Sequence, residues 1–217
     1  MLHCGAQRPM EPQATLAELV EPRRTALMVV DVQNDYCDPT YAPATVAMLP
    51  RLRTLVDEAR RFGVQVIYTR DVQGDRWNTP VWLSRHAGRP QRAGKCLEGT
   101  PGAELHPDFP PREGDLVVVK HRYSAFVGTD LEQVLRARRI ETLVFTGIAT
   151  NICVESALRD AFQRDYWTVA VSDCTATFSE TYQALSLEII ARNFGVVAEA
   201  RELIEAWQRT AVPVPAR

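Results

Sequence analysis

Short apolar runs alternate with amphipathic stretches along most of this chain. The apolar runs, which predict strands, cover residues 26–31, 64–68, 116–119, 143–145, 168–171 and 196–197. Apolar residues at helical spacing predict helices at residues 46–62, 129–138, 152–162, 180–193 and 201–207. Continuous apolar runs are typical of strands buried on both faces, and their alternation with helices indicates a parallel sheet. We therefore expect an α/β three-layer sandwich, with a mostly parallel six-stranded sheet and helices on both faces.

The boundaries of this domain follow from the same pattern. Residues 21–210 form a single predicted domain, flanked by tails at 1–20 and 211–217. Residues Thr129-Asp-Leu-Glu132 match a capping box at the start of a helix. Residues 71–109 have no clear periodicity, and so long an irregular segment usually serves as a lid or an assembly surface. Its basic residues are interpreted mainly as a solvated face: Arg85, Arg89, Arg92 and Lys95.

Residues 141–160 read as a strand, a turn at Gly147 and a helix that begins near Ile152. Cys153 falls in the first turn of that helix, where unpaired N–H groups and the helix dipole favour a thiolate. The alternative is that Cys153 is a small buried hydrophobic residue, which is common for a free cysteine. This stretch alone leaves both interpretations open.

Composition narrows the choice of partner and compartment. The chain has 217 residues, of which 46% are hydrophobic and 24% charged, and this suits one large domain. A net charge of −2 and a pI of about 6.1 give no reason to expect a nucleic-acid partner. No apolar run is long enough to cross a membrane, and the N-terminus does not resemble a secretory signal. The five cysteines are odd in number and scattered, so we expect no disulfide scaffold and a cytoplasmic location.

Three polar residues lie where apolar strands end or just beyond. Asp31 and Lys120 each close a run, and Cys153 follows the run at 143–145. Asp is common in turns and Lys is common at the surface, so each alone has an ordinary explanation. Because parallel strands end at the same edge of a sheet, however, the three positions together predict that a carboxylate, an amine and a thiol converge.

Three motifs resemble the signatures of the isochorismatase-like cysteine hydrolases. They are Asp31-Val-Gln-Asn34, Lys120 with Arg122-Tyr-Ser-Ala-Phe126, and Thr146-Gly-Ile-Ala-Thr-Asn-Ile-Cys-Val-Glu-Ser156. The resemblance spans roughly residues 27–207, and residues 120–162 are most similar to the ureidoacrylate amidohydrolase branch. It implies a Rossmann-like isochorismatase fold and a catalytic triad of Cys153, Asp31 and Lys120.

The resemblance also implies a cis peptide between Ile148 and Ala149, where the Ala149 and Cys153 N–H groups would form an oxyanion hole. Asp31 can accept the thiol proton and later protonate a leaving amine. Thiolate attack would give a covalent acyl-enzyme that water hydrolyses. The name-giving vinyl-ether hydrolases of this family lack the cysteine. Its presence favours cleavage of the C–N bond of a small amide, ureido or carbamoyl compound.

The sequence gives no sign of a catalytic metal or of another cofactor. The nicotinamidase branch has an Asp-x-His-x-x-His motif after the second strand. Here residues 70–77 read Arg-Asp-Val-Gln-Gly-Asp-Arg-Trp and hold no histidine. Because two carboxylates without imidazole make a poor zinc site, we expect no metal and do not favour nicotinamide as substrate.

The substrate-binding residues are less well indicated, because aromatic residues more often belong to the core. We predict contacts from Gln33, Asn34, Trp77 and Tyr123. The expected partners are a small-molecule substrate and further copies of the chain, since residues 71–109 and the helix with Trp207 offer apolar surface. The resemblance likewise implies a dimer or tetramer.

Two alternatives remain open at this stage. One is an isochorismatase-like hydrolase of another small substrate. The other is a non-catalytic relative that serves as a binding module, although the complete set of Asp31, Lys120 and Cys153 argues against it.

Overall fold

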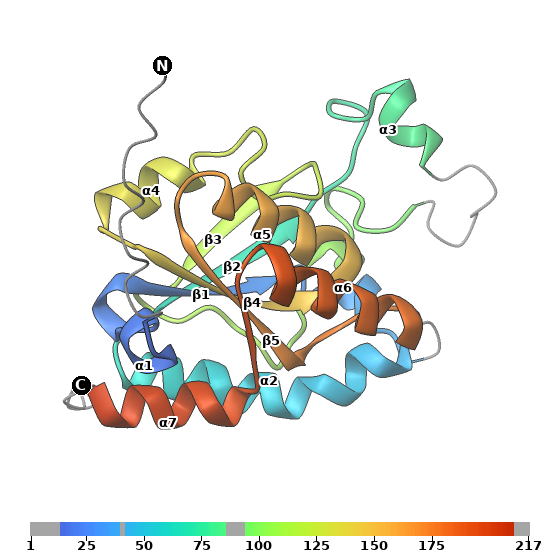
Figure 1. The fold of residues 1–217 in the computed structure, drawn as a ribbon. Helices are drawn as coiled ribbons and strands as arrows, with labels where there is room; N and C mark the ends of the chain where they lie inside the picture. Colours follow the sequence, from blue (N-terminus) through green and yellow to red (C-terminus); the bar gives the residue numbers. More distant parts are fainter. Residues whose placement is uncertain (1–13, 40–41, 86–93, 211–217) are drawn as a thin grey trace, which may run out of the picture.

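The fold is a six-stranded, wholly parallel sheet between two layers of helices (Figure 1). It is seen in a computed structural model that describes residues 14–39, 42–85 and 94–210. The strands are β1 (Thr25–Val30), β2 (Gln65–Asp71), β3 (Leu116–Lys120), β4 (Thr142–Ile148), β5 (Trp167–Ala176) and β6 (Val196–Ala198). The sheet order is β3-β2-β1-β4-β5-β6, which confirms the predicted α/β sandwich.

Helices cover both faces of the sheet. One face is covered by α2 (Pro43–Arg61) and α7 (Ala200–Thr210), and the other by α4 (Leu131–Ala137), α5 (Glu155–Phe162) and α6 (Glu180–Asn193). Alternate residues of β1 serve the two cores, since side chains of a strand point to opposite faces. Leu27 and Val29 pack with α2 and α7, whereas Met28 packs with α4, α5 and α6.

The chain reverses its direction of winding at β1. The first crossovers place β2 and then β3 on one side of β1, whereas β4, β5 and β6 extend from the other side. The carboxyl ends of strands at such a reversal form a crevice in open α/β sheets. Asp31 follows β1 at this point, and the segment carrying Cys153 follows β4.

Strand β4 is longer than predicted, because Gly147 does not end it. Gly147 pairs with Val30 of β1 and has φ of +99°, a conformation that L side chains rarely adopt. A Cβ atom here would lie 2.1 Å from the Val30 carbonyl oxygen. Glycine therefore lets the two strands pair closely and carries β4 on to Ile148.

The predicted capping box at residues 129–132 is wrong. Helix α4 begins after Asp130, whose side chain makes no cap hydrogen bond. The Thr129 hydroxyl instead donates to the Ala125 carbonyl at 2.5 Å and accepts from the Leu131 N–H at 3.2 Å. Glu132 points to Arg164, which it meets at 3.0 Å.

Part of the predicted N-terminal tail at 1–20 is structured. Helix α1 (Leu16–Leu19) begins with a capping box of Thr15 and Glu18 and packs beside α7. The indole N–H of Trp207 donates to the Val20 carbonyl at 3.1 Å, and Trp207 is fully buried. Trp207 therefore offers no surface to a partner, contrary to our expectation. Residues 1–13 and the predicted tail at 211–217 lie outside the described residues.

In the described part of the chain, no helix combines the length and the apolar character needed to cross a bilayer.

Candidate active site

A buried ion pair lies at the carboxyl edge of the sheet. The Lys120 ammonium is 2.7 Å from Oδ2 of Asp31, and both side chains are completely buried. Asp31 has φ of +52°, and Thr69 holds its carboxylate by donating to Oδ1 at 2.6 Å. Lys120 also donates to the Arg122 carbonyl at 3.0 Å. These contacts fix the carboxylate and the ammonium in one orientation.

Cys153 is brought to the same place by a π-helical turn, Thr150–Val154, between β4 and α5. The regular α-helix starts at Glu155, later than the predicted start near residue 152. The peptide between Ile148 and Ala149 is cis, at the predicted bond. Cys153 is 7% exposed and lies beside Asp31 and Lys120, close enough for their charges to affect its pKa. The structure thus brings together the three side chains that the strand ends predicted.

Electrostatics favour a protonated thiol at rest. Burial raises the pKa of Cys153 well above its ordinary value; Lys120 opposes this increase, whereas Asp31 adds to it. Burial also raises the pKa of Asp31, against the lowering effect of Lys120. Burial lowers the pKa of Lys120, but the charges of Asp31 and Cys153 outweigh it, and the net shift is upward. Burial therefore opposes the resting thiolate that we expected from the helix terminus, and the thiol lies beside a carboxylate that can act as its base.

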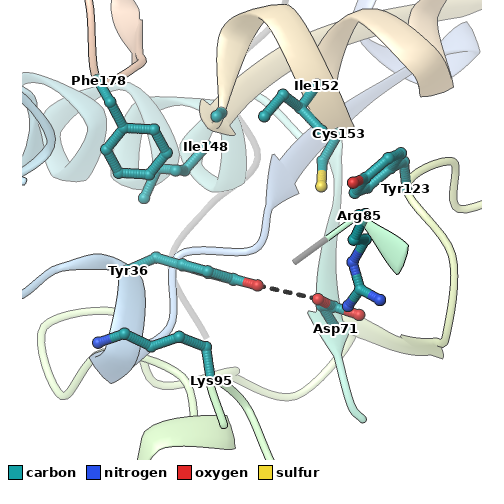
Figure 2. A pocket seen from close by; sticks show the side chains of 10 residues that line it. Tyr36, Asp71, Arg85, Lys95, Tyr123, Ile148, Ile152, Cys153 and Phe178 are labelled. Carbon is teal, nitrogen blue, oxygen red and sulfur yellow. Dashed lines mark hydrogen bonds between the residues drawn. The ribbon is translucent and has the colours of Figure 1, made fainter. Parts of the chain in front are cut away.

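A pocket of about 600 Å³, including its open mouth, leads to the cysteine. It is lined by Tyr36, Asp71, Arg85, Lys95, Tyr123, Ile148, Ala149, Ile152, Cys153 and Phe178. Figure 2 shows the sulfur of Cys153 pointing into this space, with Phe178 and Ile148 on one side and the Tyr36–Asp71 hydrogen bond across from them. Asp31 and Lys120 are not among its described lining residues and lie beside Cys153.

The structure places one of the four predicted substrate-binding residues at the pocket and the other three elsewhere. Tyr123 lines the pocket, as does Ala149 of the predicted oxyanion hole. Gln33, Asn34 and Trp77 are absent from its described lining and have other partners. Gln33 donates to the Asp71 and Ala103 carbonyls at 2.9 and 2.8 Å, Asn34 donates to the Pro101 carbonyl at 2.8 Å, and Trp77 stacks on His121 at 3.8 Å. These three residues hold the surrounding loops instead of contacting the cavity.

Several lining residues were missed by sequence reasoning. Asp71 ends β2, which is longer than predicted, and so lies at the same sheet edge as Asp31. Asp31 was identified as a polar residue at the end of an apolar strand. Asp71 would have been identified in the same way if the predicted strand had extended to residue 71. Arg85 and Lys95 belong to the irregular segment and line the pocket, so the solvated face that we inferred for most of this basic cluster does not describe these two residues. Arg89 and Arg92 lie outside the described residues.

At the position of the nicotinamidase metal motif, this chain has residues that form hydrogen bonds with other side chains. Asp71 accepts from the Tyr36 hydroxyl at 2.9 Å and from the Gln73 amide. Over the residues that the structure describes, no group of three or more His, Cys, Asp or Glu side chains is arranged to hold a metal ion. The absence of a catalytic metal remains a prediction.

A cysteine beside a buried carboxylate–ammonium pair, at the carboxyl edge of a parallel sheet, defines an α/β cysteine hydrolase. Comparisons with known proteins agree. Residues 25–214 match the isochorismatase domain. The ureidoacrylate amidohydrolase RutB of Agrobacterium fabrum is 36% identical over 207 residues, covering 84% of this chain and 90% of that protein.

Solved structures give the same result. A cysteine hydrolase from Pseudomonas syringae superposes with a TM-score of 0.81 at 32% identity, covering 88% of this chain and 96% of that one. N-carbamoylsarcosine amidase from Thermoplasma acidophilum superposes with a TM-score of 0.69 at 29% identity, covering 82% of this chain and 96% of that one. The chain belongs to the isochorismatase family, as its motifs predicted. It is a hydrolase that acts on carbon–nitrogen bonds of small amides.

Proposed function

We propose that this enzyme cleaves a small ureido or carbamoyl compound through a covalent intermediate on Cys153. The observation that carries the proposal is the pocket-lining thiol of Cys153 beside the carboxylate of Asp31, which Lys120 holds at 2.7 Å. The names of two similar proteins, ureidoacrylate amidohydrolase and N-carbamoylsarcosine amidase, support this substrate class.

In the first step Asp31 takes the proton of the Cys153 thiol as sulfur attacks the carbonyl carbon. A C–S bond forms, and the carbonyl becomes a tetrahedral oxyanion, to which the N–H groups of Ala149 and Cys153 would donate. The oxyanion then collapses and the C–N bond breaks. The proton held by Asp31 passes to the departing nitrogen, which leaves as ammonia or an amine.

In the second step water adds to the thioester carbonyl. Asp31 accepts a proton from this water, and sulfur leaves as the thiol once the proton returns to it. Lys120 stays protonated in both steps, since its net pKa shift is upward. Its role is to keep Asp31 ionised and oriented toward Cys153 against the cost of burial.

Asp71 suits the nitrogen end of such a substrate. A ureido group presents several N–H donors, and Asp71 offers carboxylate oxygens to the pocket. Tyr36 and Gln73 fix this carboxylate by hydrogen bonds, so it would orient the scissile carbonyl without rearrangement.

Ammonia release from a panel of small molecules tests this function. We expect turnover of ureido acids or N-carbamoyl amino acids, faster than that of simple carboxamides and nicotinamide. We also expect the rate to survive dialysis against a chelator, because the proposed steps use only protein side chains. A preparation that loses activity to the chelator and regains it with zinc would contradict metal independence. Turnover confined to unrelated amides would favour the alternative, a hydrolase of another small substrate.

We further propose that the enzyme is a homo-oligomer. An exposed stripe on α6 supports this, in which Tyr182, Leu185 and Ile189 repeat at helical spacing and continue toward Phe178 at the pocket. A second copy seated on this stripe would cover part of the active-site mouth. Light scattering of the active enzyme should give a dimeric or tetrameric mass, and Leu185→Glu should lower it. A monomeric mass in an active preparation would refute the assembly.

A cytoplasmic location is proposed on the chemistry of the thiols. The cysteines within the described ranges are all free and buried: Cys37, Cys96, Cys153 and Cys174. A reducing compartment suits a mechanism that requires a free thiol.

A further inference from the structure

The pocket contains two cationic side chains that the proposed mechanism does not use. Arg85, just after α3 (Pro80–Ser84), and Lys95 both line it, whereas Asp71 carries the one carboxylate among the described lining residues. Figure 2 shows the Arg85 guanidinium near Asp71 and Tyr123, on the side of the pocket toward which the sulfur of Cys153 points. An excess of positive charge therefore faces a substrate at the nucleophile.

Arg85 is held in position by its neighbours. Its guanidinium donates to the Trp82 carbonyl at 2.6 Å and to the Gln73 side chain at 3.2 Å. It also stacks over the Trp82 ring, 3.8 Å from the ring centroid. A guanidinium has five N–H donors, so these two hydrogen bonds leave donors for a ligand. The side chain is thus oriented before substrate binds, which reduces the entropy lost on binding.

Arg85 also has no counter-ion in the part of the chain that the structure describes. Within the described residues it forms no ion pair, and the Asp71 carboxylate that interacts with it over a longer range is engaged by Tyr36 and Gln73. Lys95, in contrast, has a carboxylate oxygen of Asp35 at 3.8 Å. A partly buried guanidinium loses hydration that an anionic ligand would replace, by paired hydrogen bonds that match its planar fork.

We propose that Arg85 binds a carboxylate that the substrate carries in addition to its ureido or carbamoyl group. The enzyme would then select ureido or carbamoyl acids over neutral amides. This inference rests on the proposed function, which it deepens by naming the charge of the substrate and the residue that recognises it.

Alkylation of Cys153 tests the inference without requiring the natural substrate. Iodoacetate and iodoacetamide are alike in size and differ in charge. The ratio of their rates at Cys153, measured by peptide mass spectrometry, reports anion recognition in the pocket. We expect Arg85→Met to lower the iodoacetate-to-iodoacetamide ratio at least about tenfold, a factor equivalent to about 1.4 kcal/mol. The rate with iodoacetamide should change little.

Arg76→Met is the matched control, because Arg76 lies in the same segment, is exposed and does not line the pocket. It removes the same charge and should keep the wild-type ratio. An unchanged ratio in Arg85→Met, or equal losses with both reagents, would overturn the proposal. Ammonia release provides a separate readout: if no ureido or carbamoyl compound is turned over, the proposed function fails, while the alkylation ratio still decides the role of Arg85.

Discussion

Cys153→Ser is expected to lower kcat by at least about ten-thousandfold, a loss of the order seen when a catalytic nucleophile is removed. Serine is far less acidic than cysteine, and the buried carboxylate of Asp31 is too weak a base to activate it. The substitution is nearly isosteric, so the serine hydroxyl can take the place of the thiol beside Asp31 and the fold should be retained. Ammonia release and a thermal melt measure the two effects.

Cys37→Ser is the matched control. Cys37 is also a free, buried thiol, and burial raises its pKa to about 12, but it does not line the pocket. This variant should keep most of the wild-type rate. Near-wild-type ammonia release from Cys153→Ser would remove Cys153 from the mechanism.

Lys120→Arg is expected to lose at least roughly a hundredfold in kcat, the low end for a misplaced acid–base group. Lys120 places one compact charge beside Asp31 in a site with no exposed side-chain surface. The larger, forked guanidinium would clamp the carboxylate in a bidentate pair and compete with the thiol for it. If the charge alone mattered, the rate would stay within a few-fold of wild type, and this account of the triad would have to be abandoned.

Measurements of unfolding distinguish the structural role of Lys120, as the partner of a buried carboxylate, from its catalytic role. Lys120→Met leaves the Asp31 carboxylate buried without its partner and should lower the free energy of unfolding by about 3–5 kcal/mol. Lys120→Arg keeps the charge and should melt closer to wild type. Arg60→Lys provides the comparison, since Arg60 forms a largely buried pair with Asp115 at 2.6 Å, away from the pocket. It should change the melt without changing kcat per folded enzyme.

The order of strands and helices was predictable because burial on both faces of a parallel sheet produces continuous apolar runs. The ends of elements were less predictable. Residues 172–176 of β5 include polar side chains and follow a register irregularity opposite β4, so the apolar run at 168–171 understates the strand. Helix α1 is short and owes its place to contact with α7, which local sequence does not reveal.

The catalytic site was more predictable than the substrate pocket, for a physical reason. Asp31 and Cys153 follow strands and Lys120 ends one, and the carboxyl ends of parallel strands all lie at the same edge of the sheet. Arg85 and Lys95 reach the pocket through an irregular segment, whose path depends on contacts such as the bridge between Gln73 and Leu97. The spacing of apolar residues along the sequence does not indicate such contacts. The protonation state of Cys153 likewise depends on burial that no linear motif reports.

The most direct test of the covalent mechanism is rapid-quench mass spectrometry of the enzyme, intact and after digestion, during turnover of a ureido acid. The account predicts a transient adduct on the peptide that contains Cys153, absent from Cys153→Ser. Its mass identifies the cleaved bond, because a carbamoyl adduct means that the amine left first and a larger acyl adduct means that ammonia left first. Turnover without any adduct on Cys153, under quench conditions that preserve a synthetic carbamoylated Cys153, would contradict the account.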